Sequence, residues 1–254
     1  MQLKLLSKEE KKVTFLINET EAYIVNALRR MIIEEVPTMA IEEVTFVKNQ
    51  SALYEEIIAH RMGLIPLTTD LKSYNLKSEC KCKEKGCALC QLKFVLEAKG
   101  PCIVYSENLK SKDLKVKPVY PDMPITKLLK GQTLQLEATA VLGQGKDHTK
   151  FSPGLPYYRS LPILTASSNA NIKAIIEKSS NLVAKGKGLE IKDLAKWNEA
   201  DEQLCEQNGV KVEYSDNDFI FTIESWGQLD AGKIVATATD LFSKKLKDFE
   251  KKLK

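Results

Sequence analysis

The sequence lacks any long apolar run. No stretch of its 254 residues approaches the roughly 18 apolar residues that a membrane-spanning helix needs. Met1 leads directly into strand-like sequence without a signal peptide. We therefore expect a cytoplasmic chain with no membrane contact. Hydrophobic residues make up 43% and charged residues 28% of the chain, which is usual for a soluble globular protein large enough to bury a core.

Excess positive charge is scarce outside one end of the chain. The formal net charge is +4, and residues 244–254, with six lysines against Asp248 and Glu250, account for all of it. A protein that binds a phosphate backbone by itself usually carries a broader basic surface. Direct binding to DNA is therefore not the favoured interpretation.

Histidine is also scarce. The sequence has 2 histidines, His60 beside Arg61 and His148 beside Asp147. No nucleophile or metal-ligand spacing accompanies His60, and no third group accompanies the Asp147–His148 pair. We expect His60 to pack or form a hydrogen bond at a helix end, and we expect no catalytic residue in this chain.

Four of the 6 cysteines fall within eleven residues, in the pattern C-x-C-x4-C-x2-C. They are Cys80, Cys82, Cys87 and Cys90. Disulfides are disfavoured in a cytosolic chain, and four thiolates this close together can enclose one zinc ion. Because a fourth cysteine leaves no position open for water, the zinc site should be structural. An iron–sulfur cluster on the same thiolates is the alternative.

The stretch 18–47 combines helix and strand signals. Asn18 stands three residues before Glu21, a capping-box spacing, and Pro37 should end the helix at Val36. The strand that follows alternates apolar residues. The helix's apolar residues cover about half of a helical wheel, which predicts burial on two sides: Ile24, Val25, Ala27, Leu28, Met31, Ile32 and Val36.

Two arginines leave this apolar arc in adjacent positions. Arg29 and Arg30 should point in different directions, so at least one guanidinium can reach an acidic or carbonyl partner at the edge of the buried zone. The alternative is a core helix with two solvated arginines.

Alternation and turn residues place the elements of the first two thirds of the chain. Residues 2–17 should form a hairpin, and residues 51–62 a helix. Residues 92–98 and 134–142 should be strands.

Two helices are expected in region 165–210, one holding Ile172 to Val183 and ending at the GKG of 186–188, the other holding Ile191 to Leu204. A hairpin should follow, with strands at 210–214 and 219–223 joined by a turn.

The last helix should be capped by Asp230. Its apolar stripe is long enough to require a partner, although packing within its own domain is the alternative. The outer part of the stripe consists of Leu241, Phe242, Leu246, Phe249 and Leu253.

Several segments together resemble one protein family. NALRR from Asn26, VPTMAIEEV from Val36, EIIAHRMGLIPLTTD from Glu56 and GKDHTKFSPG from Gly145 resemble the archaeal DNA-directed RNA polymerase subunit called D. The third-largest subunit of eukaryotic RNA polymerase II and the N-terminal domain of bacterial alpha are its relatives. The final helix also resembles that of the family, so the resemblance covers nearly the whole chain.

The resemblance implies an α+β fold with a discontinuous dimerisation domain, residues 1–48 and 211–254. A sheet-containing domain at 49–160 would be inserted and carry the loop with four cysteines. Residues 161–210 would be a remnant of a ferredoxin-like region that holds iron–sulfur clusters in many archaeal members. Because this region contains only Cys205, and a cluster needs about four thiolates, no cluster is expected there. Cys102 and Cys205 should be plain apolar thiols.

The resemblance further implies a non-catalytic assembly platform for transcription. The chain would form a heterodimer with the small subunit L and dock the small subunits N and P and the second-largest catalytic subunit. DNA would be contacted only through the complex, whose nucleotidyltransferase activity would lie elsewhere, since this chain offers no aspartate triad for magnesium ions. The residues implied at subunit interfaces are Asn26, Arg29, Arg30, His60, Arg61, Lys146, Asp147, His148, Leu241, Phe242, Leu246, Phe249 and Leu253.

The resemblance also favours zinc over an iron–sulfur cluster, because the eukaryotic relative has a similar CxC and CxxC loop. The spacing between the two pairs is one residue shorter in the family. Two other functional classes remain open. A free-standing zinc-containing nucleic-acid-binding protein should bind DNA alone with steep salt dependence. A metal-dependent hydrolase would need an open metal position, which the fourth cysteine removes.

Overall fold

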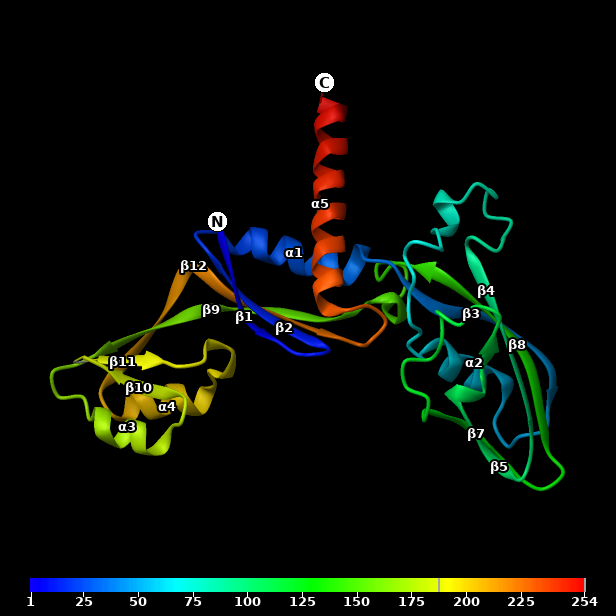
Figure 1. The fold of residues 1–254 in the computed structure, drawn as a ribbon, viewed down its shortest axis with the longest axis horizontal. Coiled ribbons are helices and arrows are strands. Elements are labelled where there is room, and N and C mark those ends of the chain that lie inside the picture. Colours follow the sequence, from blue (N-terminus) through cyan, green and yellow to red (C-terminus); the bar gives the residue numbers. More distant parts are fainter. Residues whose placement is uncertain (187, 254) are drawn as a thin grey trace. The chain divides into compact units, whose positions relative to one another are not determined.

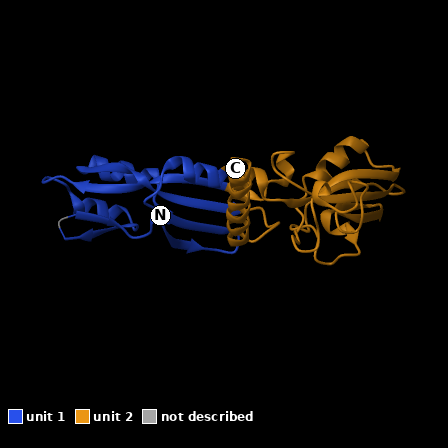
Figure 2. Ribbon diagram, turned by 90° about the horizontal axis from the view of Figure 1, so that it is seen from above, with its two compact units in different colours: residues 1–29, 156–224 blue, residues 30–155, 225–254 orange. Residues whose placement is uncertain are grey.

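The computed structural model describes residues 1–186 and 188–253 (Figure 1). Its contacts define two compact units (Figure 2): Met1–Arg29 with Pro156–Glu224, and Arg30–Leu155 with Ser225–Lys254. Helices and several separate sheets alternate along the chain, so the expected α+β class is confirmed. These units do not coincide with the three expected domains, whose boundaries stay a prediction.

The first unit contains a four-stranded sheet with the order β1-β2-β12-β9. The expected N-terminal hairpin is confirmed, because β1 and β2 pair antiparallel with Leu3 opposite Ile17. Next along the sheet, Phe15 of β2 lies opposite Phe221 of β12, and the two rings stack with centroids 5.1 Å apart. The strands are β1 (Gln2–Lys8), β2 (Lys12–Asn18), β9 (Gly154–Ala166) and β12 (Val210–Ser225).

The expected hairpin at 210–223 is wrong, because β12 is one continuous strand. The polar residues predicted to turn instead bind a neighbouring loop: the Asn217 carbonyl accepts from the Thr20 N–H at 2.9 Å, and Asp218 Oδ1 accepts from the Glu19 N–H at 3.1 Å. Val210 belongs to one core cluster, whereas Phe219 to Ile223 are buried in the sheet of β2. The polar residues therefore lie in the part of β12 that connects two separate hydrophobic cores.

A small α+β module lies between β9 and β12. It contains α3 (Ile172–Lys178), the antiparallel strands β10 (Leu182–Lys185) and β11 (Gly188–Ile191), and α4 (Glu199–Gln207). Its hydrophobic core consists of Ile175, Leu182, Trp197 and Cys205, together with Val210 at the start of β12.

Two helices are present in this module as expected, but both are shorter than predicted, so the predicted bounds are wrong. Helix α3 ends at Ser179, whose hydroxyl donates to Asp201 at 2.6 Å and accepts from the Asn181 N–H at 3.2 Å. Such side-chain bonds compete with helix continuation. Val183 and Ile191 therefore lie in strands. The helix end expected at 186–188 falls partly outside the described residues. Cys205 is buried as expected, and burial raises the pKa of its thiol to about 11, whereas Cys102 is exposed.

The second unit contains a four-stranded antiparallel sheet with the order β3-β8-β4-β6 and a two-stranded sheet of β5 and β7. The strands expected at 92–98 and 134–142 are confirmed as β4 and β8. Residues 38–48, expected in the dimerisation domain, lie in β3 and pair with β8 in this unit. The strands are β3 (Thr38–Asn49), β4 (Gln91–Lys99), β5 (Cys102–Tyr105), β6 (Lys110–Ser111), β7 (Pro124–Leu128) and β8 (Thr133–Gly143).

Helix α2 (Glu55–Gly63) covers part of this core with Ile58 and Met62, both 0% exposed. It starts later than the expected 51–62 because residues 49–53 form a turn in which Asn49 and Ser51 hydrogen-bond to each other. Short 3-10 turns lie at Lys77–Glu79, Ser106–Asn108, Thr149–Phe151 and Leu194–Lys196.

Two helices complete the fold, α1 (Ala22–Glu35) and α5 (Ala231–Leu253). Asn18 is the last residue of β2, so the expected capping box is wrong, whereas the helix end before Pro37 is confirmed. Asp230 caps α5 as expected, because its Oδ1 accepts from the N–H groups of Gly232 and Lys233 at 2.9 and 3.2 Å. None of the described helices has the length and apolar character to cross a membrane.

Candidate metal site and interface residues

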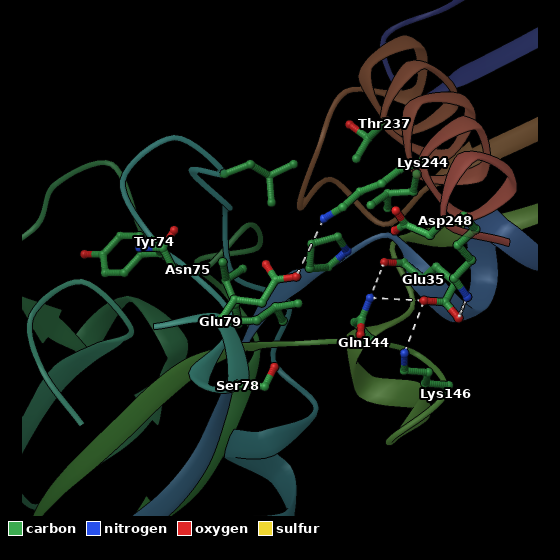
Figure 3. Close-up of a pocket in the computed structure, with 16 residues that line it drawn as sticks. Glu35, Tyr74, Asn75, Ser78, Glu79, Gln144, Lys146, Thr237, Lys244 and Asp248 are labelled. Carbon is green, nitrogen blue, oxygen red and sulfur yellow. Dashed lines mark hydrogen bonds and ion pairs between the residues drawn. The ribbon is translucent and has the colours of Figure 1, made fainter. Parts of the chain in front are cut away.

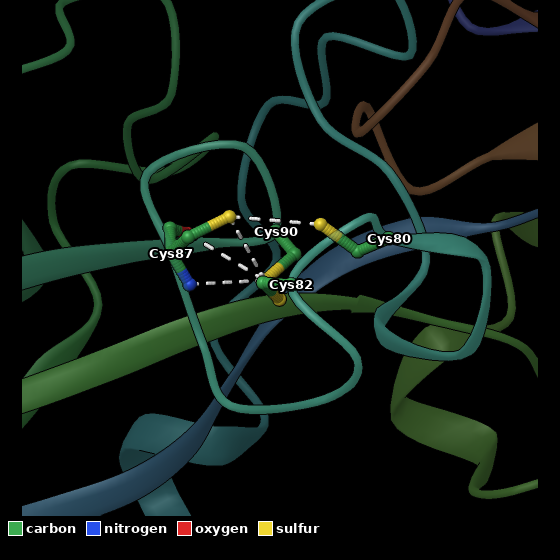
Figure 4. A group of neighbouring side chains, drawn as sticks. All are labelled: Cys80, Cys82, Cys87 and Cys90. Carbon is green, nitrogen blue, oxygen red and sulfur yellow. Dashed lines mark hydrogen bonds between the residues drawn. The ribbon is translucent and has the colours of Figure 1, made fainter.

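The four clustered cysteines turn their sulfur atoms toward one another (Figure 4). The Sγ atoms of Cys80 and Cys87, and those of Cys82 and Cys90, are each 3.6 Å apart, and Cys87 and Cys90 are separated by 3.9 Å. All four lie within 4.8 Å of one another. Zinc–sulfur bonds of about 2.3 Å in a tetrahedron put sulfurs roughly 3.8 Å apart, while a disulfide holds them at about 2.05 Å. The spacing therefore fits a metal shell.

Backbone turns build this arrangement. The N–H groups of Cys90 and Gln91 both donate to the Cys87 carbonyl at 3.0 Å, which closes the second Cys pair into a tight turn. Lys83 and Glu84 adopt φ of 51° and 64°, and Gly86 adopts 84°. The loop thus folds back on itself between the CxC and CxxC pairs, which brings their thiols to one point.

The polar environment also suits metal ligands. The Cys87 N–H points at Cys90 Sγ at 3.3 Å, a bond that stabilises a thiolate. Burial raises the pKa of Cys90 to about 12. Burial opposes ionisation of Cys82 as well, but hydrogen bonds from Cys80, Cys90 and the Gly86 backbone lower its pKa to about 7. A thiolate is the form that binds metal, so the lowered pKa of Cys82 favours its ligand form, and the four cysteines can bind a metal ion.

The two arginines of α1 are held by their own helix. Arg29 Nε donates to Asn26 Oδ1 at 3.0 Å, and Arg30, whose side chain is 61% exposed, forms an ion pair with Glu34 at 3.1 Å. Arg30 therefore has an acidic partner one turn away along α1, but in an exposed pair and not at the edge of the buried zone.

Arg61 and His60, at the end of α2, are placed differently. Arg61 Nη1 donates to the Ile125 carbonyl of β7 at 2.9 Å, so this residue ties two elements of its own unit together. The side chain of His60 is exposed, so of the two expected arrangements, packing or a hydrogen bond at the helix end, packing is wrong.

The segment 145–148 is anchored by its first residues. Lys146 Nζ lies 3.2 Å from Glu35 Oε2, whereas Asp147 is exposed. His148 is exposed too, and its Nδ1 accepts from the Lys150 N–H at 3.0 Å, so it caps the following turn. Asp147 and His148 are therefore accessible to another chain.

The outer stripe of α5 is largely uncovered. Leu241 and Phe242 are half-buried, and Leu246, Phe249 and Leu253 are 54%, 61% and 71% exposed. Exposed apolar side chains that recur on one helix face are typical of an interaction surface.

One carboxylate that sequence reasoning did not identify lies at the centre of a charged cluster in the second unit (Figure 3). The side chain of Glu35 is only 10% exposed and lies between Lys245 and Lys146. Burial opposes ionisation of Glu35, but these two ammonium groups lower the pKa of its carboxyl below the ordinary value. No short-range spacing could reveal this cluster, because its members are about 110 and 210 residues apart.

Comparison with protein-family models identifies the class of one domain of the chain. A family model described as the RNA polymerase Rpb3/RpoA insert domain matches residues 39–154, which include the sheet β3-β8-β4-β6 and the cysteine loop. The second unit therefore contains the insert domain of an RNA polymerase subunit.

Whole-chain relatives then define the family. The chain is 34% identical to DNA-directed RNA polymerase subunit Rpo3 of Methanosarcina acetivorans, over 98% of this chain and 96% of the relative. It is 37% identical to subunit Rpo3 of Pyrococcus furiosus over 98% and 95%, and 32% identical to that of Archaeoglobus fulgidus over 98% and 97%. The chain belongs to the Rpo3 family of RNA polymerase subunits. Rpo3 is the same subunit as the one called D.

Proposed function

We propose that this chain is a non-catalytic assembly subunit of an archaeal, cytoplasmic DNA-directed RNA polymerase. The observation that carries the proposal is the similarity to subunit Rpo3 across 98% of the chain. Nucleotidyl transfer would take place elsewhere in the complex, and DNA would be contacted only through it. The expected domains, 1–48 with 211–254, 49–160 and 161–210, are retained as part of this proposal.

The proposed partner of α5 is the small subunit L. The exposed stripe of Leu246, Phe249 and Leu253 supports this, because an apolar helix face of this kind is covered in a heterodimer. The small subunits N and P and the second-largest catalytic subunit would dock elsewhere. Further interface residues proposed are Asn26, Arg29, Arg30, His60, Arg61, Lys146, Asp147 and His148.

The metal proposed for the cysteine loop is a single structural zinc. Cys80, Cys82, Cys87 and Cys90 would hold it, and it would supply a cross-link between the two cysteine pairs. Lysines that surround the loop would offset the charge of about −2 on zinc with four thiolates: Lys77, Lys81, Lys83, Lys85 and Lys93. The module of residues 161–210 would need no cluster, since Ile175, Trp197 and Cys205 give it a protein core.

Isolation of an affinity-tagged chain from its native cells tests the proposal. We expect the two largest polymerase subunits and several small ones to copurify in equal amounts, and the isolated material to extend RNA on a DNA template. The tagged chain alone should show neither this activity nor salt-dependent DNA binding. Purification of the chain without any other polymerase subunit would contradict the proposal. Tight binding of the chain by itself to DNA at low salt would favour a free-standing nucleic-acid-binding protein instead.

A further inference from the structure

The carboxylate of Glu35 joins three segments that lie far apart in the sequence (Figure 3). Its Oε1 is 2.5 Å from Lys245 Nζ of α5, and its Oε2 is 3.2 Å from Lys146 Nζ and 3.3 Å from Gln144 Nε2. All four residues belong to the second unit. The Glu35 side chain is 10% exposed and its two lysine partners are about half exposed, so solvent screens these contacts in part.

The segment 144–146 closes the end of α1. Gln144 Nε2 donates to the Glu35 carbonyl at 2.8 Å, and the Lys146 N–H donates to the Glu34 carbonyl at 3.1 Å. These carbonyls would otherwise lack helical partners. A Cβ atom at Gly145 would collide with the Ile33 carbonyl oxygen, so the approach is as close as backbone allows. Glu35 is therefore fixed on the α1 side by contacts that do not involve α5.

The contacts of α5 are unevenly distributed along its length. Among the described residues of α5, the buried ones are Ala231, Ile234 and Ala238, all within its first eight positions. Farther along, a cleft of about 530 Å³ separates α5 from the 71–79 segment, with Leu241 and Lys244 on its α5 side. Lys244 reaches Glu79 across the cleft only at 4.0 Å, and both side chains are more than 60% exposed.

Among the described residues, the pair Lys245–Glu35 is thus a close ion pair that holds the middle of α5 to the rest of its unit, at 2.5 Å against the 4.0 Å of Lys244–Glu79. The exposed apolar stripe continues immediately beyond it, from Leu246 to Leu253. A surface that binds a partner gains affinity when it is already held in the bound orientation.

We propose that Glu35 is a positioning residue that fixes the direction of α5 and so presents the Leu246–Leu253 stripe to the partner subunit. This inference rests on the proposed function, since it assumes that α5 is the pairing helix. Glu35 acts through Lys245, while Lys146 and Gln144 hold Glu35 itself in place.

Substitution of single members of the cluster in the full chain tests the proposal. Two readouts are used: hydrogen exchange of the α5 amides in the chain alone, and affinity for the small subunit of the same polymerase. We expect Glu35→Gln to speed exchange beyond residue 240 and to weaken partner binding, each by about tenfold, which is typical of the loss of a coupled ion pair. Glu34→Gln is the matched control, because Glu34 is the neighbouring carboxylate and, within the described part of the chain, its ion pair is with the exposed Arg30.

Two lysine variants separate positioning from general stability. Lys245→Gln should reproduce both effects of Glu35→Gln, and the double variant should be no worse than either alone. Lys146→Gln should speed α5 exchange less than Lys245→Gln does, because Gln144 and the Lys146 N–H still hold the end of α1. Lys245 is 55% exposed, so its variant should fold even if Glu35→Gln does not.

Unchanged α5 exchange in Lys245→Gln, or faster exchange without a loss of affinity, would overturn the positioning role. An equal effect of Glu34→Gln would overturn it as well. If the unmodified chain does not bind the small subunit, the proposed pairing function fails. Even then, faster hydrogen exchange of the α5 amides in Lys245→Gln than in Lys146→Gln would support the claim that Glu35 fixes the direction of α5.

Discussion

Replacement of both Phe242 and Phe249 with aspartate should abolish pairing with the partner subunit. Phe249 is 61% exposed in the isolated chain, so it has a large apolar area available for burial. Removal of two aromatic rings from a contact and burial of two unpaired carboxylates in their place should cost at least about 4 kcal/mol, or roughly a thousandfold in affinity. Size-exclusion chromatography of the coexpressed chains measures the loss of the complex.

The control for this variant keeps two new carboxylates on the same helix. Ser243→Asp with Lys247→Asp places them on exposed positions outside the stripe, where they remain hydrated. This control should pair normally. Since Phe242 is half-buried, Phe249→Asp alone should show a partial loss without any change in folding. Full pairing by the double phenylalanine variant would show that α5 is not the pairing helix.

Loss of two ligands from the cysteine loop should remove its metal completely. We expect about one zinc ion per purified chain, and none in the variant Cys82→Ser with Cys87→Ser. Since metal binding contributes directly to folding of such loops, by about 10 kcal/mol or more in isolated zinc peptides, residues 76–91 should become fast in hydrogen exchange. The sheet β3-β8-β4-β6 has its own buried core and should stay folded.

Elemental analysis gives the metal content, and Cys102→Ser is the control, because Cys102 is exposed and lies outside the loop. Detection of iron, together with the visible absorption of an iron–sulfur cluster, would support the cluster and contradict the zinc site. A chain free of any metal after anaerobic purification would contradict the metal site itself.

The elements that sequence patterns predicted correctly are those specified by neighbouring residues. The hairpin of β1 and β2, the strands β4 and β8, and the cap of α5 by Asp230 each depend on alternation or on a side chain within a few positions. The cysteine cluster is equally predictable from the sequence, because its four thiols lie within one loop.

The failures occurred where distant contacts override a local pattern. The polar residues around Asn217 predict a turn, but the Asn217 carbonyl and the Asp218 carboxylate accept hydrogen bonds from the Thr20 and Glu19 N–H groups, and β12 continues as one strand. Ser179 and Asp201 end α3 through a bond between residues 22 positions apart. Glu35 was missed for the same reason, because its lysine partners come from a turn and a helix much later in the chain.

The stoichiometry of the chain coexpressed with the small subunit of its polymerase tests the central claim most directly. Native mass spectrometry distinguishes a heterodimer from either homo-oligomer by mass alone. The account predicts one copy of each chain in a single stable species, together with one zinc ion, and aggregation or self-association when the chain is expressed alone. A chain that remains a monodisperse monomer and does not bind the small subunit would contradict the account.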